Sequence, residues 1–194
     1  FRSIAPDTSA KRFFPRVPTA GSQWERLPNV GRTMKFRITA RDNNIEGGGI
    51  SWDDMVVSVS STAGPFRVTA PNNFVIWRYG EIRQITWDVA NTNLPPFNCK
   101  SVNILLSNNG GKSFDLKIAD NVPNNGLYCF VVPDTFGTAG ITNARIKIEP
   151  VQGIYYDYSD NSFQIKAPFK PTFNLCGAEA AAAVCLPIPY TTNL

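Results

Sequence analysis

Residues 103–119, NILLSNNGGKSFDLKIA, decide the fold class because two alternating segments flank a turn. Apolar side chains occupy every second position over 102–106 and again over 114–118. This period of two is typical of a β-strand with one buried face. Between the segments, Asn109-Gly110-Gly111 supplies residues that adopt positive φ at little steric cost. The stretch therefore predicts a β-hairpin with a tight turn.

The same alternation recurs along the chain, and no long segment has the helical period. Seven expected strands within about 100 residues, separated by Asn, Gly and Pro, favour a β-sandwich of immunoglobulin (Ig) or fibronectin-III type. Two further strands precede STAGP at 61–65, which we interpret as a linker broken at Gly64-Pro65. The expected strands are centred on 34–38, 55–59, 66–68, 85–89, 102–106, 114–118, 127–131, 144–148 and 163–165.

These patterns predict an all-β chain in three parts. Residues 1–64 would form a partial Ig-like module with too few strands for a complete sandwich. Residues 65–166 would form a seven-strand Ig-like sandwich. Residues 167–194 would form a linker and the start of a further module, since APFKPTFN at 167–174 is polar and interrupted by proline.

Composition excludes several kinds of catalytic chemistry. None of the 194 residues is histidine, which removes Ser-His-Asp and Cys-His nucleophile systems, imidazole bases and HExxH-type zinc sites. The net charge of +4 is modest, and its cations fall on polar strand positions, so we expect a solvated face and no nucleic-acid partner. No apolar run approaches the roughly 18 residues of a membrane span, so no span is expected.

Four cysteines, Cys99, Cys129, Cys176 and Cys185, are not arranged in CxxC pairs. A zinc site made from all four would have unusual spacing. Their even number in a strand-rich chain favours disulfides and an oxidising compartment. Three pairings are possible, and local spacing favours Cys99–Cys129 together with Cys176–Cys185.

The turn itself resembles a motif of other proteins. Ser107 to Phe114 fits S-x-[DN]-x-G-x-[ST]-[FW], the Asp-box found repeatedly in sialidases and similar β-propellers. There the motif occurs once per blade and is structural, whereas this chain holds one copy. A glycosidase would also need two placed carboxylates or a tyrosine nucleophile, which nothing here marks. We therefore interpret Ser107, Asn109, Gly110, Gly111 and Phe114 as a structural turn, in which Ser107 bonds local backbone and Phe114 folds over the hairpin.

Two other stretches are candidate binding sites. RDNNIEGGGISWDD at 41–54 gathers Asp42, Asp53 and Asp54 around glycines, and clustered carboxylates on a loop can hold calcium. The alternative is a solvated loop with Asx-turns. YYDYSDNSF at 155–163 is either an aromatic platform for a glycan or, as we favour, a strand–turn–strand with half-buried tyrosines.

Longer strings resemble one family over roughly residues 1–166, most specifically over 64–165. The strings are RTMKFRITARDN (32–43), DDMVVSV (53–59), TAGPFRVTAPN (62–72), ITWDVANTN (85–93), FNCKSVNILLSNNGGKSF (97–114), ARIKIEP (144–150) and YYDYSDNSFQI (155–165). They resemble the Ig-like region that follows the catalytic domain in secreted reprolysin-like (adamalysin-type) zinc metalloproteases of the Bacteroidetes.

This resemblance implies an architectural role. The parent would hydrolyse peptide bonds with a zinc-bound water, but the zinc motif needs three histidines, so no catalytic residue carries over to this chain. The expected function is a non-catalytic accessory, spacer or binding region of an exported protein at the cell surface or outside the cell. Its expected partners are the parent catalytic domain and a protein substrate or a surface glycan, with no cofactor of its own except the calcium considered above. The alternative is a carbohydrate- or surface-binding adhesin module, and a glycan-cleaving enzyme is the weakest hypothesis.

Overall fold

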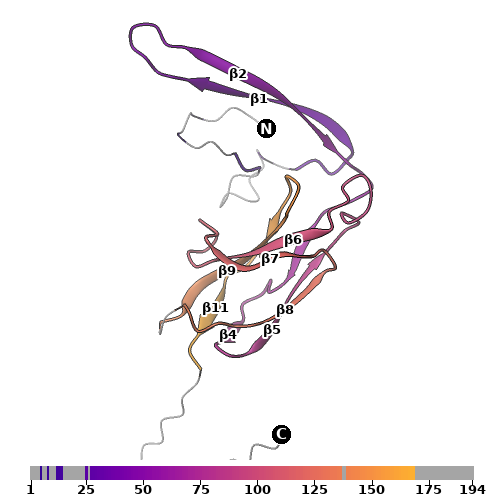
Figure 1. Ribbon diagram of the computed structural model, residues 1–194, viewed down its shortest axis with the longest axis vertical. Helices are drawn as coiled ribbons and strands as arrows, with labels where there is room; N and C mark the ends of the chain where they lie inside the picture. The colour runs from indigo at the N-terminus through magenta and orange to yellow at the C-terminus, as the bar shows by residue number, and fades with distance from the viewer. Residues whose placement is uncertain are drawn as a thin grey trace, which may run out of the picture.

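The computed structural model describes residues 5, 8, 12–14, 25, 27–136 and 139–168. Within these residues the fold is all-β, without helices, and is consistent with a β-sandwich carrying a projecting two-stranded ribbon (Figure 1). The strands are β1 (Arg32–Arg41), β2 (Ile50–Val59), β3 (Arg67–Ala70), β4 (Ile76–Arg78), β5 (Ile82–Asp88), β6 (Ser101–Ser107), β7 (Leu116–Pro123), β8 (Leu127–Val131), β9 (Ile141–Pro150), β10 (Asp157–Tyr158) and β11 (Phe163–Lys166).

Strands β1 and β2 form the ribbon, which stands apart from the other strands in Figure 1. Their antiparallel register runs without a bulge from Arg32 opposite Val59 to Arg41 opposite Ile50. Because paired residues share a face, one face carries an apolar row that includes Phe36. The other face carries Lys35, Arg37 and Arg41.

No residue of either ribbon strand is fully buried. On the apolar face, Ile38 is 65% and Met55 52% exposed; on the other face, Trp52 is 60% exposed. A hairpin in water is at best marginally stable unless another layer covers one of its faces. Within the described part of residues 1–64, the sequence therefore yields a single hairpin and no second sandwich.

Two sheets build the larger body. The smaller has the order β3-β5-β8, and the larger has the order β4-β11-β9-β6-β7, with β10 also paired to β9. All pairings are antiparallel except that of β4 with β11, which is parallel. The chain therefore changes sheet between β3 and β4: β3 belongs to the small sheet, whereas β4 belongs to the large one.

The core lies between these sheets because the inward side chains of both are apolar. Ile85 and Trp87 come from the small sheet, whereas Ile104, Ile146 and Phe163 come from the large one; all five are at most 3% exposed. Full burial of such a side chain stabilises a fold by roughly 1.5–3 kcal/mol. This core fixes the positions of the surface residues described below.

A buried asparagine links the turn after β7 to both β5 and the loop before β6. The Asn124 side chain accepts a hydrogen bond from the Trp87 indole N–H at 2.8 Å. It donates to Thr92 Oγ1 and to the Cys99 carbonyl oxygen, both at 3.1 Å. Asn124 is only 4% exposed, so these bonds replace the water that burial removes.

All seven strands expected between residues 65 and 166 are present, as are the two strands expected before residue 61. The short strand β10 falls in the strand–turn–strand favoured for residues 155–163, whereas the short strand β4 was not expected. The parallel strand β4 begins two residues after Phe74 and has only three residues. A segment of this length is too short to show alternation. The expected segment 167–194 lies almost entirely outside the described residues.

Candidate functional site

The loop between β6 and β7 is held by side-chain bonds to its own backbone. Ser107 Oγ accepts hydrogen bonds from the N–H of Gly111 at 2.8 Å and of Asn109 at 3.3 Å. Asn109 Oδ1 in turn accepts the N–H of Ser113 at 3.0 Å. The loop spans eight residues, 108–115, so it is longer than a tight two-residue turn. Ser107 and Asn109 have local structural partners here, as the turn interpretation requires.

The glycines of this loop allow a close approach to neighbouring side chains. Gly111 has φ of +91°, and a Cβ placed on it would lie 3.2 Å from Arg145 Cδ and 3.7 Å from Phe114 Cζ. Gly110, with φ of +76°, donates its N–H to the Asn143 carbonyl oxygen at 2.9 Å. The loop is thereby attached to β9, and the Phe114 ring lies against Gly111.

Next to this loop, the outer surface of the large sheet carries a cluster of aromatic and charged side chains. Arg145 and Lys147 point outward because they alternate with the buried Ala144, Ile146 and Ile148 of β9. We call this cluster the aromatic face and define it by Phe114, Arg145, Lys147, Tyr156 and Tyr158.

The side chains of the aromatic face contact one another. The rings of Tyr156 and Tyr158 are stacked with centroids 6.5 Å apart and planes 18° apart. The Lys147 ammonium lies 4.6 Å from the Tyr156 ring centroid, and the Arg145 guanidinium lies 5.6 Å from that of Tyr158. Phe114 lies 5.9 Å from Tyr158. Such cation–π geometry contributes on the order of 1 kcal/mol per pair, more where water is excluded.

The electrostatics of the face follow from partial burial. Lys147 is only 8% exposed, and its ammonium is paired with Glu149 at 2.6 Å. Burial raises the pKa of Tyr156 to about 12, with the nearby Tyr158 and Asp157 adding to the shift. Burial likewise raises the pKa of Tyr158. Both phenols therefore stay neutral at physiological pH, and the Tyr156 hydroxyl has no hydrogen-bond partner among the described residues.

Two residues from near the N-terminus connect the aromatic face to the ribbon. The Phe13 ring meets Tyr156 edge-on at 5.6 Å, and Lys147 lies 5.4 Å from its centroid. The next residue, Phe14, contacts Phe36 of the ribbon at 5.1 Å. Successive side chains of this segment thus contact different parts of the molecule, and Phe13 covers part of the face.

The aromatic face presents flat apolar ring surface beside the Arg145 guanidinium, a combination that suits a sugar ring or an extended polar chain. The Lys147 ammonium is paired with Glu149 and the Tyr156 hydroxyl is buried, so these two groups are not offered to a ligand. The Glu149 carboxylate is engaged by Lys147. Asp157, whose pKa burial raises to about 6, accepts the Val68 N–H at 2.7 Å between β10 and β3. That carboxylate therefore serves to join the two sheets.

The sequence identified only part of this face. Tyr156 and Tyr158 were expected either in a glycan platform or half-buried in a strand–turn–strand, and they are half-buried beside β9. Arg145 and Lys147 were not singled out, although their alternation in ARIKIEP places them on one surface. Phe13 could not have been found, because nothing in the local sequence shows that it meets residue 156.

The structure does not bring together the three carboxylates of the calcium hypothesis. Asp42 lies at the ribbon tip, where hydrogen bonds from the N–H of Asn44 and then of Gly49 lower its pKa. Asp53 and Asp54 are adjacent in β2 and so point to opposite faces. Asp54 forms a bidentate pair with Arg37 at 2.7 Å, which lowers its pKa. The Asx-turn alternative describes Asp42 better.

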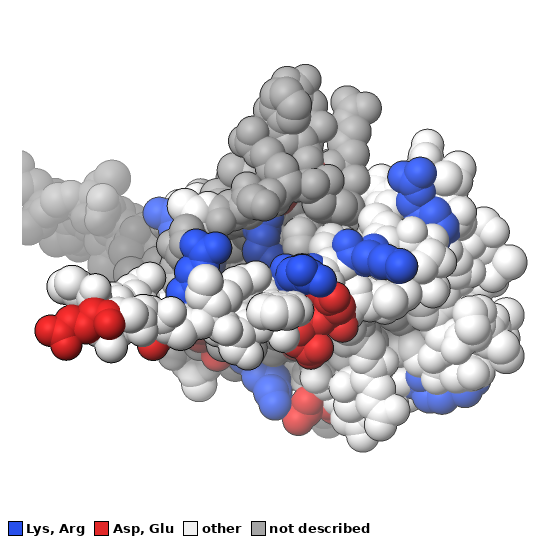
Figure 2. Space-filling model, turned by 90° about the horizontal axis from the view of Figure 1, so that it is seen from above, with Lys and Arg blue, Asp and Glu red and all other residues white. Residues whose placement is uncertain are grey.

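Viewed from the ribbon side, Lys and Arg side chains form separate clusters, with acidic groups between them and at one end (Figure 2). The four cations of β1 are matched within the ribbon region by Asp42, Glu46, Asp53 and Asp54. A surface on which charges of both signs are interspersed is weakly attracted to a polyanion.

The expected Cys99–Cys129 disulfide is not formed, because both are free thiols. Cys99 is buried, and its Sγ donates to the Ser101 carbonyl oxygen at 3.3 Å. Cys129 is exposed on β8, where alternation with the core-packed Tyr128 and Phe130 turns it outward. The two thiols therefore face different surroundings. Cys176 and Cys185 lie outside the described residues.

Comparisons with known proteins do not assign a family, since no family model matches this chain and no curated protein matches it significantly. The described residues contain no group of three or more His, Cys, Asp or Glu side chains placed to hold a metal ion. They also contain no helix with the length and hydropathy needed to cross a membrane.

Proposed function

We propose that this chain is a non-catalytic Ig-like accessory or binding region of a secreted zinc metalloprotease whose catalytic domain lies elsewhere in the polypeptide. The strand order of the sandwich supports the Ig-like part of the proposal, while the metalloprotease parent rests on the sequence resemblance. In Ig terms, β3, β5 and β8 correspond to strands A, B and E, and β11, β9, β6 and β7 to strands G, F, C and C′. This strand order supports an Ig-like assignment for the strands between residues 67 and 166, which is the fold that the sequence resemblance implies.

The zinc chemistry would belong to the parent and not to this chain. A reprolysin-type centre needs three histidine ligands, and none of the 194 residues is histidine. What this chain would supply is a rigid sandwich with exposed surfaces, exported together with the parent to the cell surface or the medium.

Two measurements test this role. The purified chain is expected to leave casein intact both with and without EDTA, and an EDTA-sensitive rate of hydrolysis would contradict the proposal. The coding sequence upstream of Phe1 is expected to contain an HExxHxxGxxH motif. Its absence would remove the metalloprotease parent and favour an adhesin.

The aromatic face favours a second candidate function, recognition of a surface carbohydrate by the same module. Stacked Tyr156 and Tyr158 beside Arg145 provide apolar surface and donors together. On a glycan array, the chain should bind a defined set of sugars, and Tyr158→Ala should lose that binding. Trp52→Ala is the matched control, since Trp52 is an exposed aromatic on the ribbon. An array without signal above background would exclude this candidate.

A further inference from the structure

Strand β5 has an open edge over its first residues. Its ladder with β8 runs from Ile82 opposite Val131 to Thr86 opposite Leu127. Its ladder with β3, on the other side, begins only at Thr86 opposite Ala70. The chain then leaves the small sheet at Pro71 and joins the large sheet as β4. Among the described residues, no strand accompanies residues 82–85 on that side.

The direction of the main-chain groups follows from two hydrogen bonds at the ends of the β5–β8 ladder. Trp87 N–H donates to the Gly126 carbonyl oxygen at 3.1 Å, and Val132 N–H donates to the Glu81 carbonyl oxygen at 2.9 Å. Bonded and non-bonded pairs alternate along an antiparallel ladder. Residues 81, 83, 85 and 87 therefore direct their N–H and C=O toward β8. Ile82 and Gln84 direct theirs away from β8, toward the open edge.

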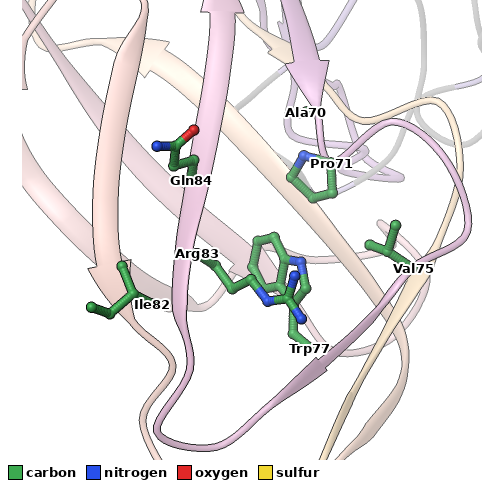
Figure 3. Close-up of a pocket in the computed structure, with 7 residues that line it drawn as sticks. All are labelled: Ala70, Pro71, Val75, Trp77, Ile82, Arg83 and Gln84. Atoms are coloured by element: carbon green, nitrogen blue, oxygen red, sulfur yellow. The ribbon is translucent and has the colours of Figure 1, made fainter.

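A cavity of ≈ 360 Å³ lies at this edge. Figure 3 shows Pro71 and Val75 on one side of it, Gln84 of β5 on the other, and Trp77 between them. Trp77 is only 3% exposed, so its ring forms an apolar floor. The hollow is largely open to solvent, and its volume exceeds that of one large apolar side chain.

The charge at the cavity is already balanced. Arg83 Nη2 lies 2.6 Å from Glu81 Oε2, and the same atom is 3.3 Å from the Ile76 carbonyl oxygen. The Arg83 hydrogen bond lowers the pKa of Glu81, so the pair stays ionised near neutral pH. The cavity thus presents no free charge, and apolar surface continues beside it at Phe74 (65% exposed) and Ile82 (74% exposed).

We propose that the open edge of β5 binds an extended peptide as an added strand, with an apolar side chain of the peptide inserted in the cavity over Trp77. The main chain of the peptide would pair with Ile82 and Gln84, as in β-strand addition. Unpaired donors and acceptors in a strand select a partner that is itself extended. This inference rests on the edge geometry and holds whichever polypeptide carries the module.

Hydrogen exchange tests the free edge without any substitution. In the full 194-residue chain, the Ile82 and Gln84 amides should exchange much faster than those of Arg83 and Ile85, which donate to β8. Slow exchange at Ile82 and Gln84 would mean that the edge is already covered and would overturn the proposal. Protection that appears only as protein concentration rises would identify a second copy as the occupant and would also overturn it.

Peptide binding is tested with a phage-displayed library of random nonapeptides selected on the full chain. An enriched sequence, made as a fluorescein-labelled peptide, should protect the Ile82 and Gln84 amides and give saturable anisotropy. Failure to enrich any sequence, or protection at other residues only, would refute the proposal.

Two substitutions at one position separate main-chain from side-chain recognition. Gln84→Pro removes the outward N–H but no bond of the β5–β8 ladder, and proline is tolerated where a strand N–H faces outward. It should weaken peptide binding at least tenfold. Gln84→Ala keeps the N–H and should change affinity by less than about threefold. Equal affinity for Gln84→Pro and the unsubstituted chain would contradict strand addition, and the exchange data remain decisive if Gln84→Pro fails to fold.

Discussion

Replacing Asn124 by alanine should destabilise the sandwich strongly. The substitution removes three side-chain hydrogen bonds: one accepted from Trp87 Nε1 and two donated to Thr92 Oγ1 and the Cys99 carbonyl oxygen. A typical bond contributes about 1 kcal/mol, and a buried donor or acceptor left without a partner costs about 1–3 kcal/mol. Because Asn124 is 4% exposed, water cannot easily restore these bonds. We expect a loss of about 3–4 kcal/mol, a large share of a typical folding free energy.

The assay is urea unfolding followed by tryptophan fluorescence, analysed as a two-state transition. Asn108→Ala is the control, since Asn108 is exposed in the β6–β7 loop, and it should stay within about 0.5 kcal/mol of the parent chain. Combining Asn124→Ala with Trp87→Phe should show a coupling energy of about 1 kcal/mol or more, since the two residues share a bond. A loss below about 1 kcal/mol for Asn124→Ala alone would refute the conclusion that the Asn124 hydrogen bonds stabilise the sandwich.

Three further predictions follow from single contacts. Burial raises the pKa of Asp157 to about 6, so between about pH 4 and 6 the folded state holds more protons than the unfolded state. The contribution of Asp157 to the free energy of unfolding should therefore fall by about 2 kcal/mol as pH rises through that window. The difference in unfolding free energy between the parent chain and Asp157→Asn measures this change, and a pH-independent difference would count against the prediction. Gly140→Ala should cost at least about 2 kcal/mol by urea unfolding, because φ is +67° and the new Cβ would overlap the Ile165 carbonyl oxygen. Ser107→Ala should lower the free energy of unfolding by about 1–2 kcal/mol, since it removes the acceptor of the Gly111 N–H. An unchanged unfolding midpoint for Gly140→Ala or for Ser107→Ala would contradict the contact assigned to that residue.

The strands were predictable because alternation is a local property. The inward row of β9, with Ala144, Ile146 and Ile148 all at 0% exposure, is visible in the sequence as every second apolar residue. The hairpin between β6 and β7 was predictable for a second local reason, the positive φ that Gly110 and Gly111 adopt in the loop. Alternation does not predict which strands pair with each other, so the parallel pairing of β4 with β11 was not foreseen.

The candidate site was less predictable because its parts are far apart in the sequence. Lys147 meets Phe13, Phe114 and Tyr156, and only the fold brings these residues together. The predicted Cys99–Cys129 pairing was wrong for a related reason. Spacing limits which thiols could meet, but the faces of the strands decide which thiols do, and Cys129 lies on an outer face.

Alternation also predicts which face of a strand is apolar, but it does not predict which element covers that face. In the sandwich the second layer is present, and Ile104 and Phe163 are fully buried. In the ribbon the same pattern gives an apolar row, yet Ile38 remains 65% exposed because residues 32–59 form one layer only. The open edge of β5 is the main-chain counterpart of that exposed face, since Ile82 and Gln84 have strand geometry but one neighbouring strand among the residues that the structure describes. Within the described residues, such regular structure without a neighbour on one side leaves main-chain groups and apolar surface available for binding.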